Sequence, residues 1–180
     1  DTILGTPQTG YVWSMLFEFD VVLDNNDNPH LLGNIYMLDP VAGQYLAGAG
    51  AFGVCDIYSN DGGTSWFGKF LSTTQTYQGV WDDNAGSTAA DRTRPALSRN
   101  AAGDKIFYVY FDTDTIANPG SENVLPDAWC IGYDLTSGLE TPLMNLTAGS
   151  LAESSVIIGN VAMISQTNGT TTSIPITYQE

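Results

Sequence analysis

Short apolar runs alternate with polar stretches rich in Asn, Asp and Gly along the whole chain. The runs span 16–23, 30–37, 52–58 and 66–72 in the first part of the chain and 95–98, 105–111, 128–134 and 143–147 in the second. They contain many β-branched and aromatic residues, and the segments 24–29 and 99–104 have the composition of hairpin turns. Helical spacing of apolar residues is nearly absent. The pattern predicts an all-β chain with four antiparallel strands in each part.

The two parts repeat each other at a spacing of 75 residues, without a gap. Tyr36 then matches Phe111, and Cys55 matches Cys130. A third copy begins near the end at the shorter spacing of 67, where Tyr178 matches Phe111. A repeat of this length that is built from short strands is typical of the blades of a β-propeller.

The repeat therefore predicts an all-β propeller, with blades of four antiparallel strands and units at about 16–90, 91–160 and 161–180. The chain would hold about two and a half blades, and closed propellers have ~4–8. We therefore expect the chain to be part of a larger propeller. The alternative is a self-contained β-domain, because 180 residues are enough to bury one core.

The segment from Ser59 to Trp66 reads S-x-D-x-G-x-x-W. Its fixed positions, Ser59, Asp61, Gly63 and Trp66, resemble the Asp-box hairpin of the sialidase-like, or BNR-repeat, propellers of secreted bacterial surface proteins. The second copy keeps only Gly138 of this motif. The resemblance implies a structural role at the turn between the third and fourth strands of a blade, away from the substrate face. The chemistry agrees, since aspartate accepts turn N–H groups and glycine tolerates a positive φ.

The resemblance also sets an expectation about catalysis. Sialidases similar to this family use three arginines around a carboxylate, a tyrosine nucleophile assisted by glutamate, and an aspartic acid, collected from several blades. Here Arg92, Arg94 and Arg99 lie in one stretch and cannot converge from three blades. His30, the single histidine, is interpreted as a surface or strand-edge residue, because the sequence identifies no partner to orient it as a base. No catalytic residue is assigned.

The chemistry of metal sites is weakly represented. The oxygen-rich segment from Asp24 to Asn28 could coordinate Ca²⁺, but an EF-hand loop starting at Asp24 would need a glutamate where Ile35 stands. A hydrated hairpin turn is the simpler interpretation. Zinc is disfavoured, since one histidine and two separated cysteines do not build the usual four-ligand site. We therefore assign no metal ligand and no cofactor, and keep Ca²⁺ as the one candidate.

The charge balance excludes some partners. The chain has 20 Asp and Glu against 5 Lys and Arg, and its net charge of −15 repels nucleic acids and anionic lipid surfaces. Only 14% of the residues are charged, while Gly, Ser, Thr and Asn are plentiful, which is typical of secreted β-proteins. No apolar run reaches the ~18 residues of a transmembrane helix. We expect an extracellular or cell-surface protein that has no nucleic-acid partner.

The two cysteines are expected to be buried thiols. Equal positions in neighbouring blades diverge, and a disulfide needs Cα atoms within ~7 Å of each other. A disulfide between Cys55 and Cys130 is the alternative, which an oxidising compartment would permit.

These observations predict a non-enzymatic propeller scaffold or binding module. Its ligand, a protein or a glycan, would be held on the loop face near the propeller axis. The first alternative is a fragment of a sialidase-type glycoside hydrolase whose catalytic residues lie in other blades. The second is a structural subunit that contacts other subunits of a larger surface assembly.

Overall fold

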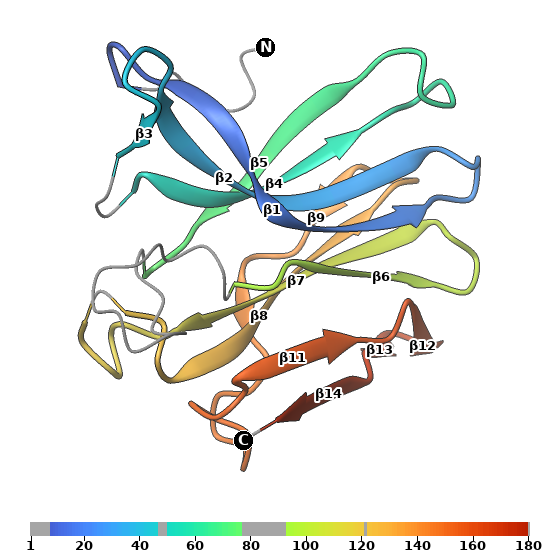
Figure 1. The fold of residues 1–180 in the computed structure, drawn as a ribbon. Helices are drawn as coiled ribbons and strands as arrows, with labels where there is room; N and C mark the ends of the chain where they lie inside the picture. The colour runs from blue at the N-terminus through green and yellow to red at the C-terminus, as the bar shows by residue number, and fades with distance from the viewer. Residues whose placement is uncertain (1–7, 47–49, 77–92, 121, 180) are drawn as a thin grey trace.

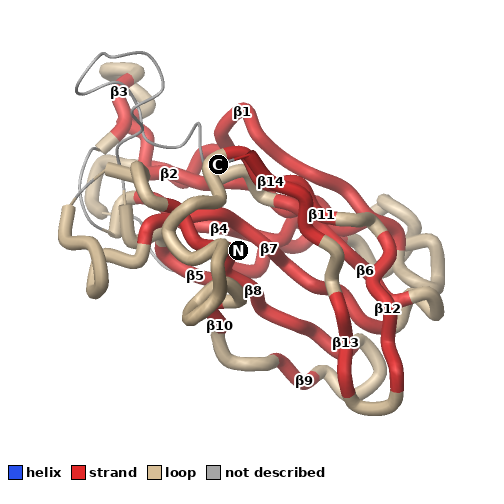
Figure 2. The backbone as a smooth tube through the Cα atoms, turned by 90° about the horizontal axis from the view of Figure 1, so that it is seen from below, coloured by secondary structure: helices blue, strands red, loops and turns tan. Residues whose placement is uncertain are grey.

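The structure, a computed structural model, describes residues 8–46, 50–76, 93–120 and 122–179. Within these ranges every regular element is a β-strand, and the remaining chain forms loops and turns (Figure 2). The predicted all-β class is therefore confirmed. The described residues also include no helix that is long and apolar enough to cross a membrane.

The first sheet is an antiparallel meander with the order β1–β2–β4–β5, and the short β3 pairs with the outer part of β2. Its strands are β1 (Val12–Leu23), β2 (Pro29–Asp39), β3 (Gln44–Tyr45), β4 (Phe52–Tyr58) and β5 (Phe67–Thr73). The four long strands match the four apolar runs of the first part of the sequence. Each polar turn lies where the pattern of apolar residues is interrupted.

The second sheet repeats this order. β6 (Ala96–Asn100), β7 (Lys105–Thr113), β8 (Pro126–Asp134) and β10 (Met144–Asn145) form an antiparallel path, and β9 (Leu139–Glu140) pairs with β8. β12 (Ile164–Asn168) continues the sheet by pairing in parallel with β6.

The last part of the chain is a long hairpin. β12 pairs with β13 (Thr171–Ser173) near its tip, and β11 (Ile158–Val161) pairs with β14 (Ile176–Gln179) near its base. Gln166 faces Ser173 across the hairpin, and the residues 67 positions earlier, Arg99 and Ile106, face each other in the second sheet. The shorter repeat spacing therefore reproduces the register of the strand pairs.

The sheets stack face to face, with the first sheet above the second and β11 and β14 below it (Figure 1). The first core lies between the two large sheets and contains Val22, Leu32 and Val54 from one side and Leu97, Ile106, Tyr108, Tyr110 and Ile131 from the other. The second core joins the opposite face of the second sheet to the last hairpin, where Phe111 and Val109 pack with Val156 and Val161. Burial of these apolar faces is the main stabilising contribution to the stack.

The ungapped spacing of 75 is wrong for the third strand of each sheet. In the first sheet His30 pairs with Tyr58, and the spacing would carry this pair to Lys105 and Tyr133. Lys105 instead pairs with Asp134. Because successive side chains of a strand point to opposite faces, a slip of one residue exchanges the two faces.

The two cysteines show the result of this slip. Val54 faces the first core and its neighbour Cys55 faces away from it, whereas Cys130 lies in the second core. Cys55 and Cys130 therefore lie on corresponding strands, β4 and β8, but not at corresponding positions.

The turns at one end of the two large sheets contact each other. The Asn25 N–H donates to the Gly103 carbonyl at 3.0 Å, which joins the β1–β2 turn to the β6–β7 turn. The Gly62 N–H donates to Asn28 Oδ1 at 3.0 Å, which joins the β4–β5 turn to the β1–β2 turn. A polar cavity opens between the two sheets among residues near this end.

Candidate functional site

A cavity of about 370 Å³ lies between the first and second sheets. The first sheet contributes His30, Asp56, Tyr58, Asn60 and Lys69, and the second contributes Tyr133 and Leu135. No single strand could build this cavity, because its walls come from residues on both sides of the sheet interface.

A buried polar cluster forms the inner part of the site. His30 Nδ1 lies 2.8 Å from Asp56 Oδ2, and the Tyr108 hydroxyl donates to the same oxygen at 2.7 Å. His30 is 2% exposed, and Asp56 and Tyr108 are each 1% exposed. The other carboxylate oxygen, Asp56 Oδ1, receives no hydrogen bond from any described residue. The three side chains link β2, β4 and β7 across the sheet interface.

Strand pairing brings His30 and Asp56 together. His30 lies opposite Tyr58 and Leu32 lies opposite Asp56, so His30 and Asp56 are diagonal neighbours on one face of the β2–β4 pair. Leu32 belongs to the first core, which places this face toward the second sheet. The second sheet then supplies Tyr108 from β7.

The tyrosine of the cluster is neutral. Burial raises the pKa of Tyr108 far above its usual range, and the nearby negative charge of Asp56 raises it further. Tyr108 therefore stays protonated and donates its hydrogen bond. At the cavity wall, burial raises the pKa of Tyr58, and Tyr133 and Asp56 add to the shift.

Aromatic and charged side chains of both sheets meet at the cavity. Lys69 from β5 forms an ion pair with Glu140 of β9, and its ammonium group lies 3.8 Å from the centre of the Tyr133 ring. The Tyr58 ring stacks on His30 with centroids 5.6 Å apart and also contacts Phe67 at 5.5 Å. These contacts fix the side chains that a ligand would meet.

The position of His30 corrects the sequence-based interpretation. His30 was expected at the surface or at a strand edge, and it is buried beside Asp56. His30 does lie at the start of β2, as expected. However, β2 lies between β1 and β4, and the face of β2 that carries His30 is covered by the second sheet. The neighbouring hydroxyl of Tyr108 bonds to the carboxylate and not to the imidazole. The cluster therefore lacks the nucleophile–base hydrogen bond of a hydrolytic triad.

A second cavity, of about 320 Å³, lies beside the strands β1, β6 and β11. Its lining includes Glu18, Asp20, Arg94 and Asn160. Asp20 also accepts the Leu97 N–H at 2.8 Å, which ties β1 to β6. This cavity combines one guanidinium group with two carboxylates.

The two arginines that the structure describes, Arg94 and Arg99, do not share a site. Arg94 precedes β6 and lines the second cavity, whereas Arg99 lies near the other end of β6, against the β6–β7 turn at Gly103. A strand rises ~3.3 Å per residue, so the positions of Arg94 and Arg99 are well separated along the chain. Arg92 lies outside the described residues.

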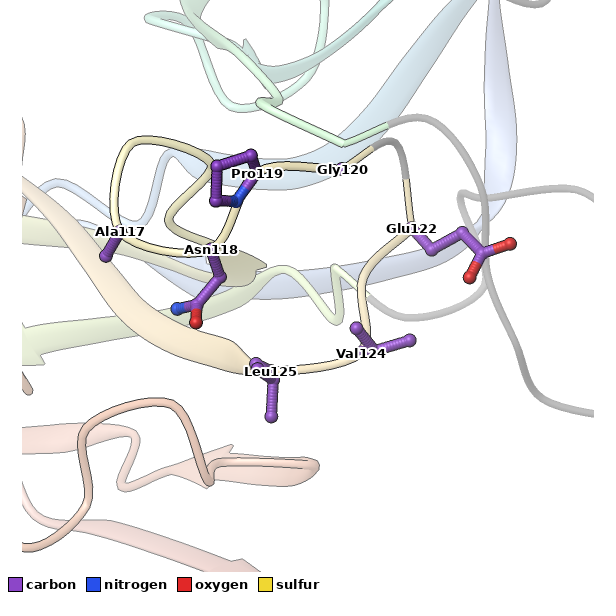
Figure 3. Close-up of a pocket in the computed structure, with 7 residues that line it drawn as sticks. All are labelled: Ala117, Asn118, Pro119, Gly120, Glu122, Val124 and Leu125. Atoms are coloured by element: carbon purple, nitrogen blue, oxygen red, sulfur yellow. The ribbon is translucent and has the colours of Figure 1, made fainter.

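A third hollow, of about 500 Å³, is framed by the β7–β8 loop. Figure 3 shows Asn118 and Pro119 on one side of this loop and Val124 and Leu125 on the other. The carboxylate of Glu122 extends away from the centre of the hollow (Figure 3). The hollow therefore presents few polar groups that could orient a ligand.

The S-x-D-x-G-x-x-W segment forms the turn between β4 and β5. Ser59 Oγ accepts the N–H groups of Gly63 at 2.7 Å and Asp61 at 3.2 Å, and it donates to Asp61 Oδ1 at 2.8 Å. Asp61 Oδ1 also accepts the Ser65 N–H at 2.7 Å. Gly63 has φ +94°, and a Cβ there would lie 3.6 Å from the Trp66 ring. All four motif residues thus belong to one turn.

The Asp24–Asn28 segment is also held by its own side chains. Asp24 Oδ1 accepts the N–H groups of Asn26 at 2.7 Å and Asn28 at 2.8 Å. Across the described ranges the structure contains no group of three or more His, Cys, Asp or Glu side chains arranged to hold a metal ion. Ca²⁺ binding by this turn stays an untested expectation.

Both cysteines are free thiols in the structure, and both are buried. Burial raises the pKa of Cys55 to about 12, and it raises the pKa of Cys130 to about 12 as well. Neither thiol has the lowered pKa of a reactive nucleophile.

Sequence reasoning missed Asp56, Lys69, Tyr108 and Tyr133. Asp56 carried a usable signal, because it is a charged residue inside the otherwise uncharged run 52–58. Lys69 carried the same signal in the run 66–72, whereas Tyr108 and Tyr133 are ordinary members of their strands and become significant only when the two sheets pack. Comparison of the chain with models of protein families, with curated proteins and with solved structures gives no match.

Proposed function

We propose that the chain is part of a β-propeller in an extracellular or cell-surface protein, where it acts as a non-enzymatic scaffold or binding module. The observation that carries this proposal is the stack of two antiparallel meanders with the same strand order, followed by a third hairpin. Successive blades of a propeller pack in this way. Their first strands would be β1, β6 and the β11–β12 segment.

The contacts of these first strands support the proposal. Asp20 of β1 accepts the Leu97 N–H of β6, and β6 pairs in parallel with β12. In a propeller the first strands of neighbouring blades lie side by side around the axis and run in the same direction. The β4–β5 turn with Ser59 and Asp61 would then be an Asp-box, placed between the third and fourth strands of the first blade.

The proposed ligand is a protein or a glycan bound near the axis. The second cavity, with Glu18, Asp20, Arg94 and Asn160, lies beside the three first strands and has the polar groups for such a site. Polar groups that converge on a cavity are typical of ligand sites.

Two other functions have a specific observation in their favour. The first is a sialidase-type glycoside hydrolase whose remaining catalytic residues lie in other blades. It is favoured by Arg94, which lines the second cavity and would be one of the arginines that bind a carboxylate. Phe19, Val21 and Leu23 expose between 46% and 59% of their surface on the free face of β1, which favours a structural subunit that packs on another protein surface.

A glycan array and a sialidase assay on the same purified chain test the proposal. We expect glycan binding without turnover, weakened at least ~10-fold by Arg94→Gln, because loss of a charged hydrogen-bonding group in a polar site costs about that much. Arg99→Gln is the matched control and should bind normally, since Arg99 lies near the other end of β6. Turnover that Arg94→Gln abolishes would overturn the non-enzymatic assignment in favour of the hydrolase. Equal binding by both variants would show that the ligand does not bind in the second cavity.

A further inference from the structure

We propose that the cavity between the first and second sheets is a second binding site, which takes one neutral sugar unit. This site is separate from the second cavity, which holds the ligand of the proposed function, because its lining residues come from β2, β4, β5, β8 and their adjoining turns. The inference rests on the charge balance, the polar groups and the size of this cavity.

The cavity concentrates the scarce basic residues of a strongly acidic chain. The chain has a single histidine and five lysines and arginines against 20 acidic residues, yet both His30 and Lys69 line this one cavity. Each basic side chain faces an acidic one, since His30 lies against Asp56 and Lys69 pairs with Glu140. Each basic side chain in the cavity wall therefore has an acidic partner.

This balance disfavours charged ligands. A cation would need an aromatic face or an accessible carboxylate. The lining carboxylate, Asp56, is 1% exposed, and the ammonium group of Lys69 already lies over the Tyr133 ring and would repel a cation. An anion would be desolvated close to the buried Asp56 carboxylate, within a chain of charge −15. A neutral ligand avoids both costs.

The polar groups of the wall match a ligand that both donates and accepts hydrogen bonds. Tyr58 and Tyr133 carry hydroxyl groups, Asn60 carries an amide and Lys69 carries an ammonium group. Asp56 also lines the cavity, at its buried inner end. Leu135 provides apolar contacts for the C–H groups of a sugar ring.

Size and rigidity complete the argument. A volume of about 370 Å³ is near the small end of the range for ligand cavities, ~300–1,000 Å³, and fits a single sugar ring. The Tyr58 ring is held between His30 and Phe67, and Lys69 is held by Glu140 and Tyr133. Because these side chains are fixed before binding, the ligand does not have to order them.

Saturation-transfer NMR on the full chain tests the proposal. The probes are the neutral methyl glycosides of glucose, galactose, mannose and N-acetylglucosamine, with glucuronate and glucosamine as charged comparators. We expect at least one neutral glycoside to bind with a dissociation constant of about 1 mM, as is usual for one small ligand with few contacts. Lys69→Gln and Tyr133→Phe should each weaken this binding about tenfold or more.

Lys105→Gln is the matched control, because Lys105 also forms an ion pair, with Asp134, but does not line the cavity. It should leave binding unchanged, and Tyr133→Phe keeps the ring in place if Lys69→Gln lowers stability. Absence of binding by all four neutral glycosides, preference for a charged sugar, or equal binding by all three variants would overturn the proposal. Loss of binding in Arg94→Gln but not in Lys69→Gln would assign the sugar to the second cavity. That result would overturn this proposal but would support the proposed function.

Discussion

Asp112 is fully buried on β7, and its carboxylate accepts the Gln75 N–H at 2.5 Å together with the N–H and hydroxyl groups of Thr76. Burial outweighs these hydrogen bonds and raises its pKa to about 6. Asp134 differs, because it is partly exposed and the hydrogen bond from Lys105 lowers its pKa to about 2. Two aspartates of the same chain therefore titrate in separate pH ranges, because their surroundings differ.

This difference predicts how stability depends on pH. Because the pKa of Asp112 is raised above the usual 3.8, its contribution to stability is present at low pH and is lost as pH rises through about 6. In the unmodified chain we expect this loss to lower the free energy of unfolding by on the order of 1–3 kcal/mol between pH 4 and pH 7. In Asp112→Asn this decrease should be absent. Urea unfolding at several pH values measures it.

Asp114→Asn is the control for Asp112→Asn, since Asp114 holds the exposed turn after β7 through the Ile116 N–H. It should keep the pH dependence of the unmodified chain. A difference between Asp112→Asn and the unmodified chain that is the same at every pH would show that only the hydrogen bonds of Asp112 matter.

At the scale of the element, side chains hold the turns between strands. Ser59 is fully buried although it lies in a turn, and its hydroxyl makes three hydrogen bonds at 2.7, 2.8 and 3.2 Å. Asn28 of the β1–β2 turn joins the same network through the Gly62 N–H. Two turns that are distant in sequence are thereby held in one arrangement.

We expect Ser59→Ala to lower the free energy of unfolding by roughly 1–3 kcal/mol, because it leaves the N–H groups of Gly63 and Asp61 without their acceptor. Ser137→Ala is the control, since Ser137 is exposed and its hydroxyl accepts one long bond of 3.4 Å from the Leu139 N–H. Chemical denaturation of both variants measures the effect. Similar stability of the two would mean that the Ser59 network is dispensable.

At the scale of the whole molecule, the last hairpin is fixed to the second sheet by close packing. Gly159 of β11 is buried, and a Cβ at this position would lie 2.1–2.5 Å from atoms of the Phe111 ring. Phe111 is itself fully buried in the second core. The absence of a side chain at Gly159 thus permits the two layers to meet.

Gly159→Ala should therefore destabilise the chain by about 1–3 kcal/mol, as is typical of overpacking in a core. Gly120→Ala is the matched control, because a Cβ there meets only the Glu122 N at 4.0 Å and should cost little. Thermal unfolding compares the two. Limited proteolysis should also cut the β11–β14 hairpin faster in Gly159→Ala. Unchanged unfolding and proteolysis would show that the hairpin is not held at this contact.

The alternation of apolar and polar residues determined the all-β class and the positions of the long strands. The run 52–58 coincides with β4, and the run 105–111 falls within β7. Local chemistry also determined the turns, since Ser59 and Asp61 form their hydrogen bonds within eight residues. Strand period and turn chemistry are local properties, and the sequence displays them directly.

The tertiary structure alone decided the register of the third strands and the chemistry of the cavity. The spacing between Cys55 and Cys130 could not reveal that a slip of one residue places them on different faces. His30 and Asp56 are 26 positions apart, and Tyr108 is a further 52 positions away. Their contact depends on which face of one sheet is buried against another, and nonlocal packing decides that, because each strand is compatible by itself with either face.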